Sequence, residues 1–228
     1  MCGRFALRTP AELLRRRFRV QLAPADLKPR YNIAPTEAAL VVAGDRPDQL
    51  VPLRWGLIPP WAADERVGLR CINARAETVC DKPAFREAVR HRRCLVPADG
   101  LYEWQTTGPY AQPWFMQRPD GQPFALAGLW ERWARPGGGV IESFAVVTVA
   151  ANAAIAPLHD RMAVVLEPEA EREWLHGRLE DALALLKPCP PDWLKLHRVS
   201  TAVNRAGADG PHLIAPVEAP PEQGQLFG

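Results

Sequence analysis

The sequence lacks the features of a membrane or secreted protein. No apolar run among its 228 residues approaches the roughly 20 residues of a transmembrane helix. No apolar stretch follows Arg4 and Arg8, as it would in a signal peptide. The five cysteines are scattered and include no Cys-x-x-Cys pair, so they indicate neither a disulfide framework nor a zinc site. We therefore expect a cytoplasmic protein with no metal and no membrane partner.

The chain also has little net charge and little lysine. A formal charge of +2 gives no global electrostatic reason to expect nucleic-acid binding. Only four of the 28 basic residues are lysine, and the others are arginine, which suits bidentate phosphate contacts and stacking on bases. A high-GC coding bias would produce the same skew. Composition alone leaves nucleic-acid binding open.

There is no internal repeat, and strand-like segments dominate. Strands are predicted at 38–43, 50–55, 94–96, 102–105, 114–117, 124–130, 144–150, 162–166 and 196–199. Helices are predicted at 9–18, where Thr9 and Pro10 resemble a capping box, and at 81–90, 169–175 and 179–186, while 30–35 is predicted as an irregular loop. The pattern favours a single α+β domain, residues 2–206, with a largely antiparallel, barrel-like β-sheet and flanking helices. Residues 207–228 are predicted as a flexible C-terminal tail.

Cys2 stands at a chemically special position, directly after the initiator methionine. Removal of Met1 would leave Cys2 with a free α-amine beside its thiol. Such a 1,2-aminothiol can form an imine with an aldehyde and then close through sulfur into a thiazolidine ring. An incidental small residue at a frayed terminus is the alternative interpretation.

Three further segments carry polar groups suited to chemistry. In 72–77, Asn73 and Arg75 alternate with small residues and could orient an oxygen-rich ligand. In 97–104, Glu103 points opposite to Tyr102 and Trp104, so it faces either solvent or a pocket where it could act as an acid or base. In 158–162, His159 could transfer protons near neutral pH.

These motifs occur together in the order seen in one family. The segments 1–5, 30–35, 54–61, 72–78, 94–104, 127–131 and 158–162 resemble those of the SRAP family, the SOS-response-associated peptidase-like proteins, which process abasic sites in single-stranded DNA. The resemblance runs from residue 2 to about residue 204. It implies a single α+β domain with a basic groove for single-stranded DNA, and neither cofactor nor metal. We expect a monomer associated with the nucleoid.

The resemblance also implies roles for individual residues. Cys2 would form the covalent crosslink to the ring-opened aldehyde, and Asn73 would position the sugar and the new ring. Glu103 resembles the catalytic carboxylate of the family, and His159 its proton-transfer residue. The implied DNA-binding residues are Gly3, Arg4, Pro35, Trp61, Arg75, Trp104 and Arg161. One departure is Ala163, where the family usually has proline, but this change removes no functional group.

Elementary chemistry agrees with these roles. An α-amine with a pKa near ~8 is partly neutral in the cell, whereas a lysine near ~10.4 is mostly charged. A thiol near ~8.5 needs help to become the closing nucleophile. An imine that sulfur does not trap would permit β-elimination of the 3′ phosphate, so a weak AP-lyase activity is expected. Glu103 could also assist self-processing of Met1, a peptidase role.

Two other functions remain open at this point. Class II glutamine amidotransferases also begin Met-Cys-Gly, but this chain has no Asn-Gly oxyanion loop and no room for a synthetase domain. A non-catalytic single-stranded-DNA-binding module would retain its affinity in a Cys2→Ala variant.

The end of the chain carries a separate signal. Gln223, Leu226 and Phe227 lie in a Gln-Gly-Gln-Leu-Phe-Gly ending that resembles in part the peptides that dock on bacterial sliding clamps. A chance match is the alternative for so short a segment. The hypothesis is that the tail recruits the protein to replication forks.

Overall fold

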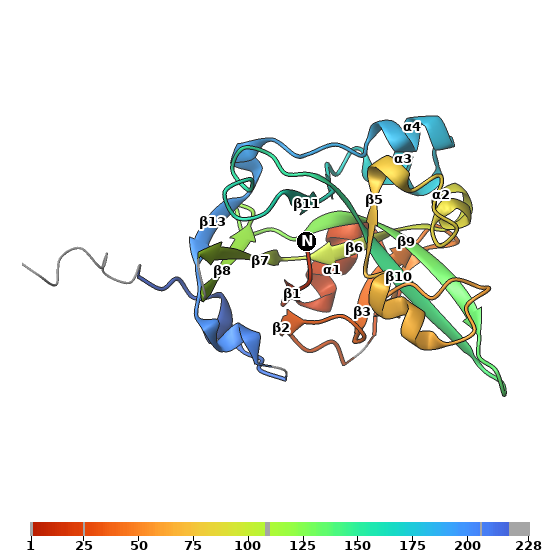
Figure 1. The fold of residues 1–228 in the computed structure, drawn as a ribbon, viewed down its shortest axis with the longest axis horizontal. Helices are drawn as coiled ribbons and strands as arrows, with labels where there is room; N and C mark the ends of the chain where they lie inside the picture. Colours follow the sequence, from red (N-terminus) through yellow and green to blue (C-terminus); the bar gives the residue numbers. More distant parts are fainter. Residues whose placement is uncertain (1, 25, 108–109, 206, 219–228) are drawn as a thin grey trace, which may run out of the picture.

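The framework of the protein is built from strands. The computed structural model describes residues 2–24, 26–107, 110–205 and 207–218. The strands are β1 (Phe5–Leu7), β2 (Arg30–Ile33), β3 (Ala38–Ala43), β4 (Arg46–Trp55), β5 (Asn73–Arg75), β6 (Arg93–Ala98), β7 (Gly100–Thr107), β8 (Tyr110–Gln117), β9 (Phe124–Ala134), β10 (Val140–Ala150), β11 (Arg161–Ala163), β12 (Val165–Leu166) and β13 (Lys195–Arg198). They form two sheets (Figure 1).

The larger sheet closes on itself. Its order is β11-β10-β4-β3-β6-β9-β12, and β9 also pairs with β10, so the path β10-β4-β3-β6-β9 forms a ring. β5 pairs in parallel with β10, and the smaller sheet has the order β13-β8-β7-β1-β2. Most pairings are antiparallel. The predicted α+β fold with a barrel-like sheet is confirmed.

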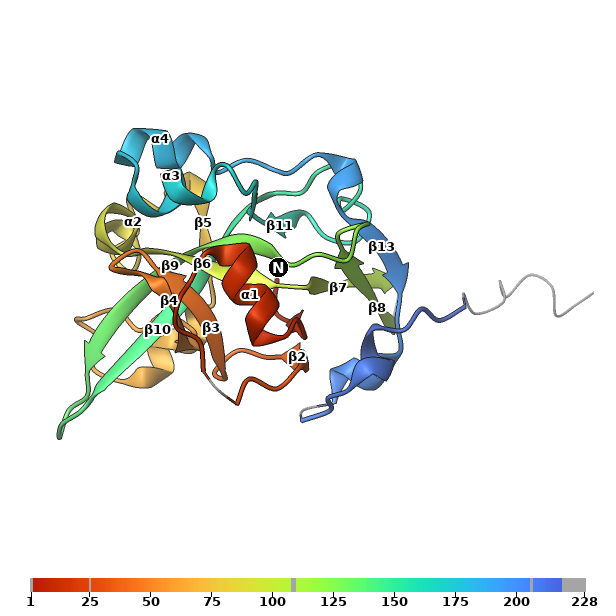
Figure 2. The ribbon, with the colours of Figure 1, turned by 180° about the vertical axis from the view of Figure 1, so that it is seen from behind.

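The helices are short and flank the sheets. They are α1 (Ala11–Phe18), α2 (Arg86–His91), α3 (Glu171–His176) and α4 (Leu179–Ala184), with 3₁₀ turns η1 (Glu65–Arg70), η2 (Ala76–Thr78), η3 (Pro191–Trp193), η4 (Thr201–Asn204) and η5 (Pro211–Ile214). Figure 2 shows α2, α3 and α4 gathered at one side of the barrel, with α1 apart from them. Among the described residues, none of these helices has the length and apolar character required to cross a bilayer.

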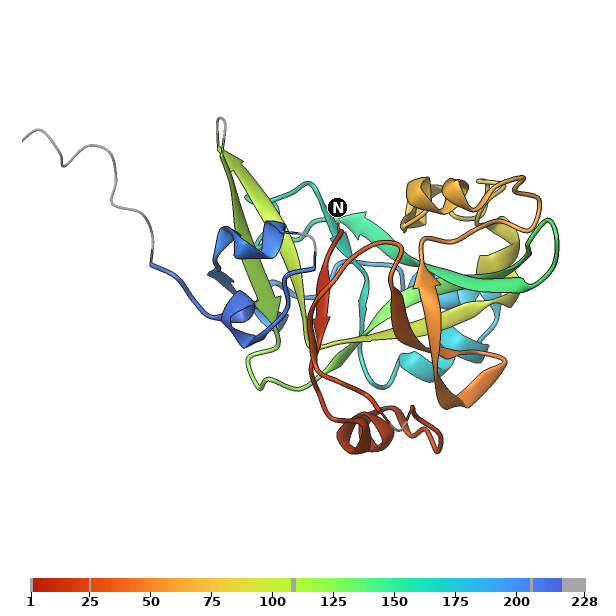
Figure 3. The same ribbon diagram turned by 90° about the horizontal axis from the view of Figure 1, so that it is seen from below.

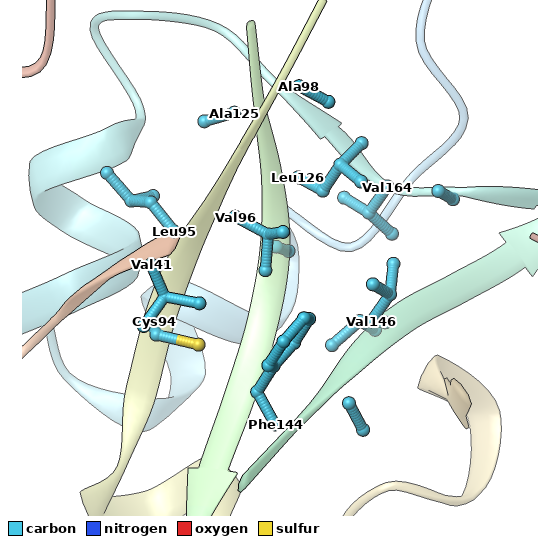
Figure 4. Packing of buried hydrophobic residues seen from close by; sticks show 14 of the residues in the cluster. Val41, Cys94, Leu95, Val96, Ala98, Ala125, Leu126, Phe144, Val146 and Val164 are labelled. Atoms are coloured by element: carbon cyan, nitrogen blue, oxygen red, sulfur yellow. The ribbon is translucent and has the colours of Figure 1, made fainter. Parts of the chain in front are cut away.

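The main core lies inside the ring of strands. Val41, Cys94, Val96, Phe144 and Val146 are all buried there and pack against one another (Figure 4). A second, smaller apolar cluster lies on the smaller sheet and comprises Ala6, Tyr102, Phe115, Val199, Val203 and Leu213. β1 and β7 therefore contribute side chains to both clusters, because alternate residues of a strand point to opposite faces.

The start of α1 differs from the prediction. Its N-cap residue is Pro10, and no side chain caps it. The Thr9 hydroxyl instead donates to Asp99, a buried carboxylate that also accepts the N–H groups of Arg8 and Thr9. A buried carboxylate needs several donors. The capping-box prediction for Thr9 was therefore wrong.

Other boundaries were also decided by contacts distant in sequence. The predicted loop at 30–35 contains β2, which pairs with β1. The strand predicted at 162–166 divides at Val164, where the chain leaves β10 for β9, because Val164 donates to Val147 and accepts from Ala127. The helix predicted from residue 81 begins only at Arg86.

The C-terminal segment packs on the domain as far as residue 217. Leu213 is fully buried in the second cluster, and Val199 forms a β-bridge with Pro216. The Val217 N–H donates to Arg198. The predicted flexible tail from residue 207 is therefore wrong for residues 207–217, because apolar side chains anchor them. Gln223, Leu226 and Phe227 lie outside the described residues.

Candidate active site

Cys2 lies in the interior of the protein at the junction of the two sheets. It precedes β1, whose three residues are all buried, and only 1% of its surface is exposed. β1 lies between β2 and β7 in the smaller sheet, and Figure 3 shows this strand, in red, near the middle of the molecule. The position of Cys2 is thus fixed by the strand that follows it.

Asn73 holds the main chain of Cys2. It lies at the start of β5, next to Val146 of β10, and its Nδ2 donates to the Cys2 carbonyl oxygen at 2.8 Å. Its Oδ1 is buried and has no hydrogen-bond partner among the described residues. An unpaired buried acceptor costs about 1–3 kcal/mol. Asn73 therefore offers one acceptor, beside Cys2, to a donor from a ligand or a processed N-terminus.

Glu103 is a buried carboxyl close to the same cysteine. The register between β1 and β7 pairs Phe5 with Leu101, and Tyr102 donates to the Arg4 carbonyl, which brings Glu103 beside the start of the chain. Glu103 is 3% exposed, while Tyr102 and Trp104 pack in the second cluster. Of the two orientations considered for Glu103, toward solvent or into a pocket, the solvent-facing one is wrong.

Burial sets the protonation of both groups. It raises the pKa of Glu103 to about 7, so this carboxyl exchanges its proton near neutral pH. Burial, and next the charge of Glu103, raise the pKa of the Cys2 thiol to about 12. The thiol is therefore protonated in this environment, and a reaction through sulfur requires a nearby base.

His159 approaches from the segment before β11. Burial lowers the pKa of its imidazole, and the Arg161 N–H donates to Nδ1 at 2.9 Å, so a neutral ring carries its proton on Nε2. The exposed carboxylate of Asp160 also lies 2.7 Å from Nδ1 and opposes this shift. The charge of Asp160 contributes to the raised pKa of Glu103, which indicates that the two segments are neighbours.

A groove opens beside Asn73. Its cavity measures about 580 Å³ and is lined by Trp61, Arg70, Cys71, Ile72, Asn73, Arg75, Thr78, Lys82, Pro83, Ala84 and Phe85. Trp61 is 62% exposed, which leaves its ring available for stacking. Arg70 and Lys82 were not identified from the sequence. No motif contains Lys82, and Arg70 reaches the groove only through the fold of η1. A basic groove with an exposed indole suits single-stranded nucleic acid.

The other DNA-binding residues expected from the sequence lie outside this groove's lining. Gly3 and Arg4 belong to the N-terminal segment, and Pro35 to the turn after β2; all three are half-buried. Trp104 is half-buried as well, and its Nε1 donates to Asn204 Oδ1 at 2.7 Å.

Arg161 already has strong partners. Its guanidinium forms a bidentate pair with Glu77, with distances of 2.6 and 2.9 Å, and donates to the Thr148 carbonyl at 2.7 Å. Its side chain is only 12% exposed. A phosphate would have to share this guanidinium with Glu77.

The described part of the chain contains no group of three or more His, Cys, Asp and Glu side chains that could hold a metal ion. The groups beside the Cys2 thiol are an amide and a carboxyl that titrates near neutral pH, and the segment that carries the His159 imidazole neighbours that carboxyl. Together they can orient a small polar ligand at Cys2 and move protons to and from it.

The chain is similar to known proteins in sequence and in fold. Residues 1–206 match the family model described as SOS response associated peptidase (SRAP). The chain is 38% identical to the "Abasic site processing protein YoqW" of Bacillus subtilis, over 94% of this chain and 99% of that one. It is 36% identical to the "Abasic site processing protein YedK" of Escherichia coli, over 95% and 100% of the two chains. A crystal structure of a Bacteroides thetaiotaomicron protein superposes with a TM-score of 0.87 at 24% identity, covering 95% and 100%.

Proposed function

The chain belongs to the SOS response associated peptidase family, and from this membership we propose that it processes abasic sites in single-stranded DNA by forming a covalent crosslink through Cys2. The observation that carries the proposal is that Asn73 and Glu103 both lie beside Cys2, with the segment of His159 next to Glu103. The names of the relatives supply the substrate class, and the basic groove beside Asn73 supplies a path for a single strand.

The proposed reaction begins after removal of Met1. The α-amine of Cys2 attacks the C1′ aldehyde of the ring-opened abasic sugar, and the resulting carbinolamine loses one water to give an imine. The thiol then adds through sulfur to the imine carbon, and its proton passes to the nitrogen. The product is a thiazolidine, and the only other product is water.

Glu103 and His159 carry the protons in this scheme. Glu103 can donate a proton to the departing hydroxyl of the carbinolamine and then, as a carboxylate, accept the proton of the buried thiol. A pKa of about 7 suits both steps, because each protonation state is populated near neutral pH. His159, neutral because burial lowers its pKa, opens the sugar ring by proton transfer. Asn73 Oδ1 accepts a hydrogen bond from the amine or the new ring.

Two lesser activities follow from the same imine and the same carboxyl. An imine that is not closed by sulfur would lose the 3′ phosphate by β-elimination after removal of a C2′ proton, which is a weak AP-lyase activity. Glu103 could also assist hydrolysis of the Met1–Cys2 bond, the peptidase role. When sulfur closes the ring, the crosslink shields the lesion during the response to DNA damage.

The test uses a single-stranded oligonucleotide with one abasic site, analysed on a denaturing gel. The wild-type protein should give a shifted band that requires the abasic site, and Cys80→Ala, which alters a half-buried cysteine elsewhere, should give the same band. Cys2→Ala retains an α-amine but no thiol. It should give no stable band, increased strand cleavage, and a band only after borohydride reduction of the imine.

The same experiment separates the alternatives. No covalent band with retained DNA affinity would identify a binding module. Neither band nor affinity, with release of ammonia from glutamine, would identify an amidohydrolase of the glutamine amidotransferase type. The clamp hypothesis for Gln223, Leu226 and Phe227 is tested separately, because clamp co-purification should be lost on deletion of residues 223–228 while crosslinking persists.

A further inference from the structure

The segment after β13 reaches two side chains of the proposed DNA site. We call residues 199–205 and 207–217 the C-terminal strap. Its Asn204 Oδ1 accepts a hydrogen bond from Trp104 Nε1 at 2.7 Å, and its Val203 carbonyl accepts one from Arg4 Nη1 at 3.1 Å. Arg4 directly precedes β1 and Trp104 lies in β7, and they are 199 and 100 residues from these partners in sequence.

The strap is held on the smaller sheet by its own interactions. Val203 and Leu213 are buried against Tyr102 and Phe115. The Asp209 carboxylate accepts the Tyr31 N–H at 2.6 Å, and the Ile214 carbonyl lies 2.8 Å from His197 Nε2. The position of Asn204 is therefore set by the packing on both sides of it.

Asn32 connects the strap to Arg4. This buried amide donates through Nδ2 to the carbonyls of Val203 at 3.2 Å and Ala208 at 2.8 Å, and its Oδ1 accepts from Arg4 Nη1 at 2.7 Å. Its Nδ2 group and its Oδ1 atom are both hydrogen-bonded, and these partners fix the orientation of the amide. The strap and Arg4 thus share one network.

Trp104 is the side chain most affected by this arrangement. The indole has a single polar atom, Nε1, and Asn204 is its acceptor. The ring also packs beside Tyr102, with 6.4 Å between ring centroids. These two contacts hold the indole ring in one orientation. The ring therefore loses less conformational entropy when a base stacks on it.

We propose that the C-terminal strap is part of the DNA-binding site and that Asn204 is a positioning residue for Trp104. This inference rests on the proposed function, because only a bound DNA strand would give Trp104 a nucleotide to contact. It adds that residues beyond the N-terminal motifs determine how tightly the single strand is held next to the lesion.

A double-mutant cycle tests the proposal. Trp104→Phe retains an aromatic ring but removes Nε1, so Asn204 then has nothing to position. In the wild-type background, Asn204→Ala should weaken binding of a single-stranded abasic oligonucleotide about 5- to 10-fold, while the crosslinking rate at saturating DNA stays the same. In the Trp104→Phe background, Asn204→Ala should cause no further loss. Gln122→Ala removes an exposed amide from a distant turn and should have no effect in either background.

A spectroscopic measurement excludes a general effect on stability. The indole N–H resonance of Trp104, identified by its absence in Trp104→Phe, should shift in Asn204→Ala and remain in place in Gln122→Ala. Equal loss of affinity in both backgrounds, no loss in either, or an unmoved resonance would overturn the inference. Failure of the wild-type protein to bind or crosslink the oligonucleotide would instead reject the proposed function.

Discussion

At the scale of single residues, the candidate site is defined by burial of groups that usually face water. Glu103 and Asn73 each have a polar atom in the interior, beside a cysteine whose main chain is fixed. Burial disfavours the charged form of a carboxyl and removes water from an amide oxygen, and it is common where chemistry requires shifted proton affinities. The site therefore combines reactivity with a local cost in stability.

That cost predicts a pH-dependent stability for Glu103. Its pKa is 4.5 in its ordinary environment and about 7 in the folded protein. As pH rises from 4.5 to 7, the unfolded chain loses this proton and the folded one retains it, so stability falls over this window and the penalty is complete above it. The shift corresponds to at most about 3 kcal/mol.

Glu103→Gln should therefore be more stable than the wild type at pH 8 and equal to it at pH 4. Denaturant unfolding of both proteins at the two pH values measures the difference. The same variant should lose most of its crosslinking activity. An equal stability difference at pH 4 and pH 8 would show that ionisation of Glu103 is not the cause.

Asn73 gives a second prediction at this scale. Asn73→Ala removes the Nδ2 donor to the Cys2 carbonyl without adding a charge to the groove. The crosslinking rate should fall at least ~10-fold, since misplacement of a reacting group reduces the rate strongly. DNA affinity at equilibrium should change little. Single-turnover rates and fluorescence anisotropy separate the two quantities, and a loss confined to affinity would contradict the positioning role.

At the scale of elements, one ion pair joins the two segments that carry Asn73 and His159. Glu77 lies in η2, directly after β5, and Arg161 begins β11. Their bidentate pair crosses between these elements, and Thr148 of β10, which lies between β5 and β11, supplies a third contact. The carboxylate of Glu77 occupies guanidinium donors of Arg161 that would bind a DNA phosphate under the proposed function.

Glu77→Gln should consequently bind single-stranded DNA more tightly, by about 2- to 5-fold, and with a steeper dependence on salt. The reason is that removal of the carboxylate leaves Arg161 uncompensated, and each phosphate contact adds to the release of counterions. Arg161→Gln should weaken binding and flatten the salt dependence. Titrations at several salt concentrations measure the affinity and its salt dependence for both variants. Weaker binding by Glu77→Gln would show that Glu77 only holds the Arg161 side chain in position.

At the scale of the whole molecule, the C-terminal segment completes the smaller sheet. Leu213 fills the second cluster, 207 residues after Ala6, with which it packs. Leu213→Ala should destabilise the protein by roughly 2–5 kcal/mol, as expected for a buried leucine. Leu13→Ala makes the same chemical change at a side chain that is 49% exposed, and should cost much less. Similar midpoints of thermal unfolding in the two variants would contradict the anchoring role of Leu213.

The sequence determined the family, the barrel-like fold class and the candidate residues around Cys2, because these depend on local motifs and strand periodicity. It did not determine what each polar group contacts. Thr9 forms a local capping pattern, yet a buried carboxylate 90 residues away takes its hydroxyl. Two of the residues proposed to bind DNA, Arg4 and Trp104, depend on the C-terminal strap, and Arg161 depends on Glu77. Only the tertiary structure decided these contacts, because hydrogen bonds and burial are set by distance in space, which sequence separation does not specify.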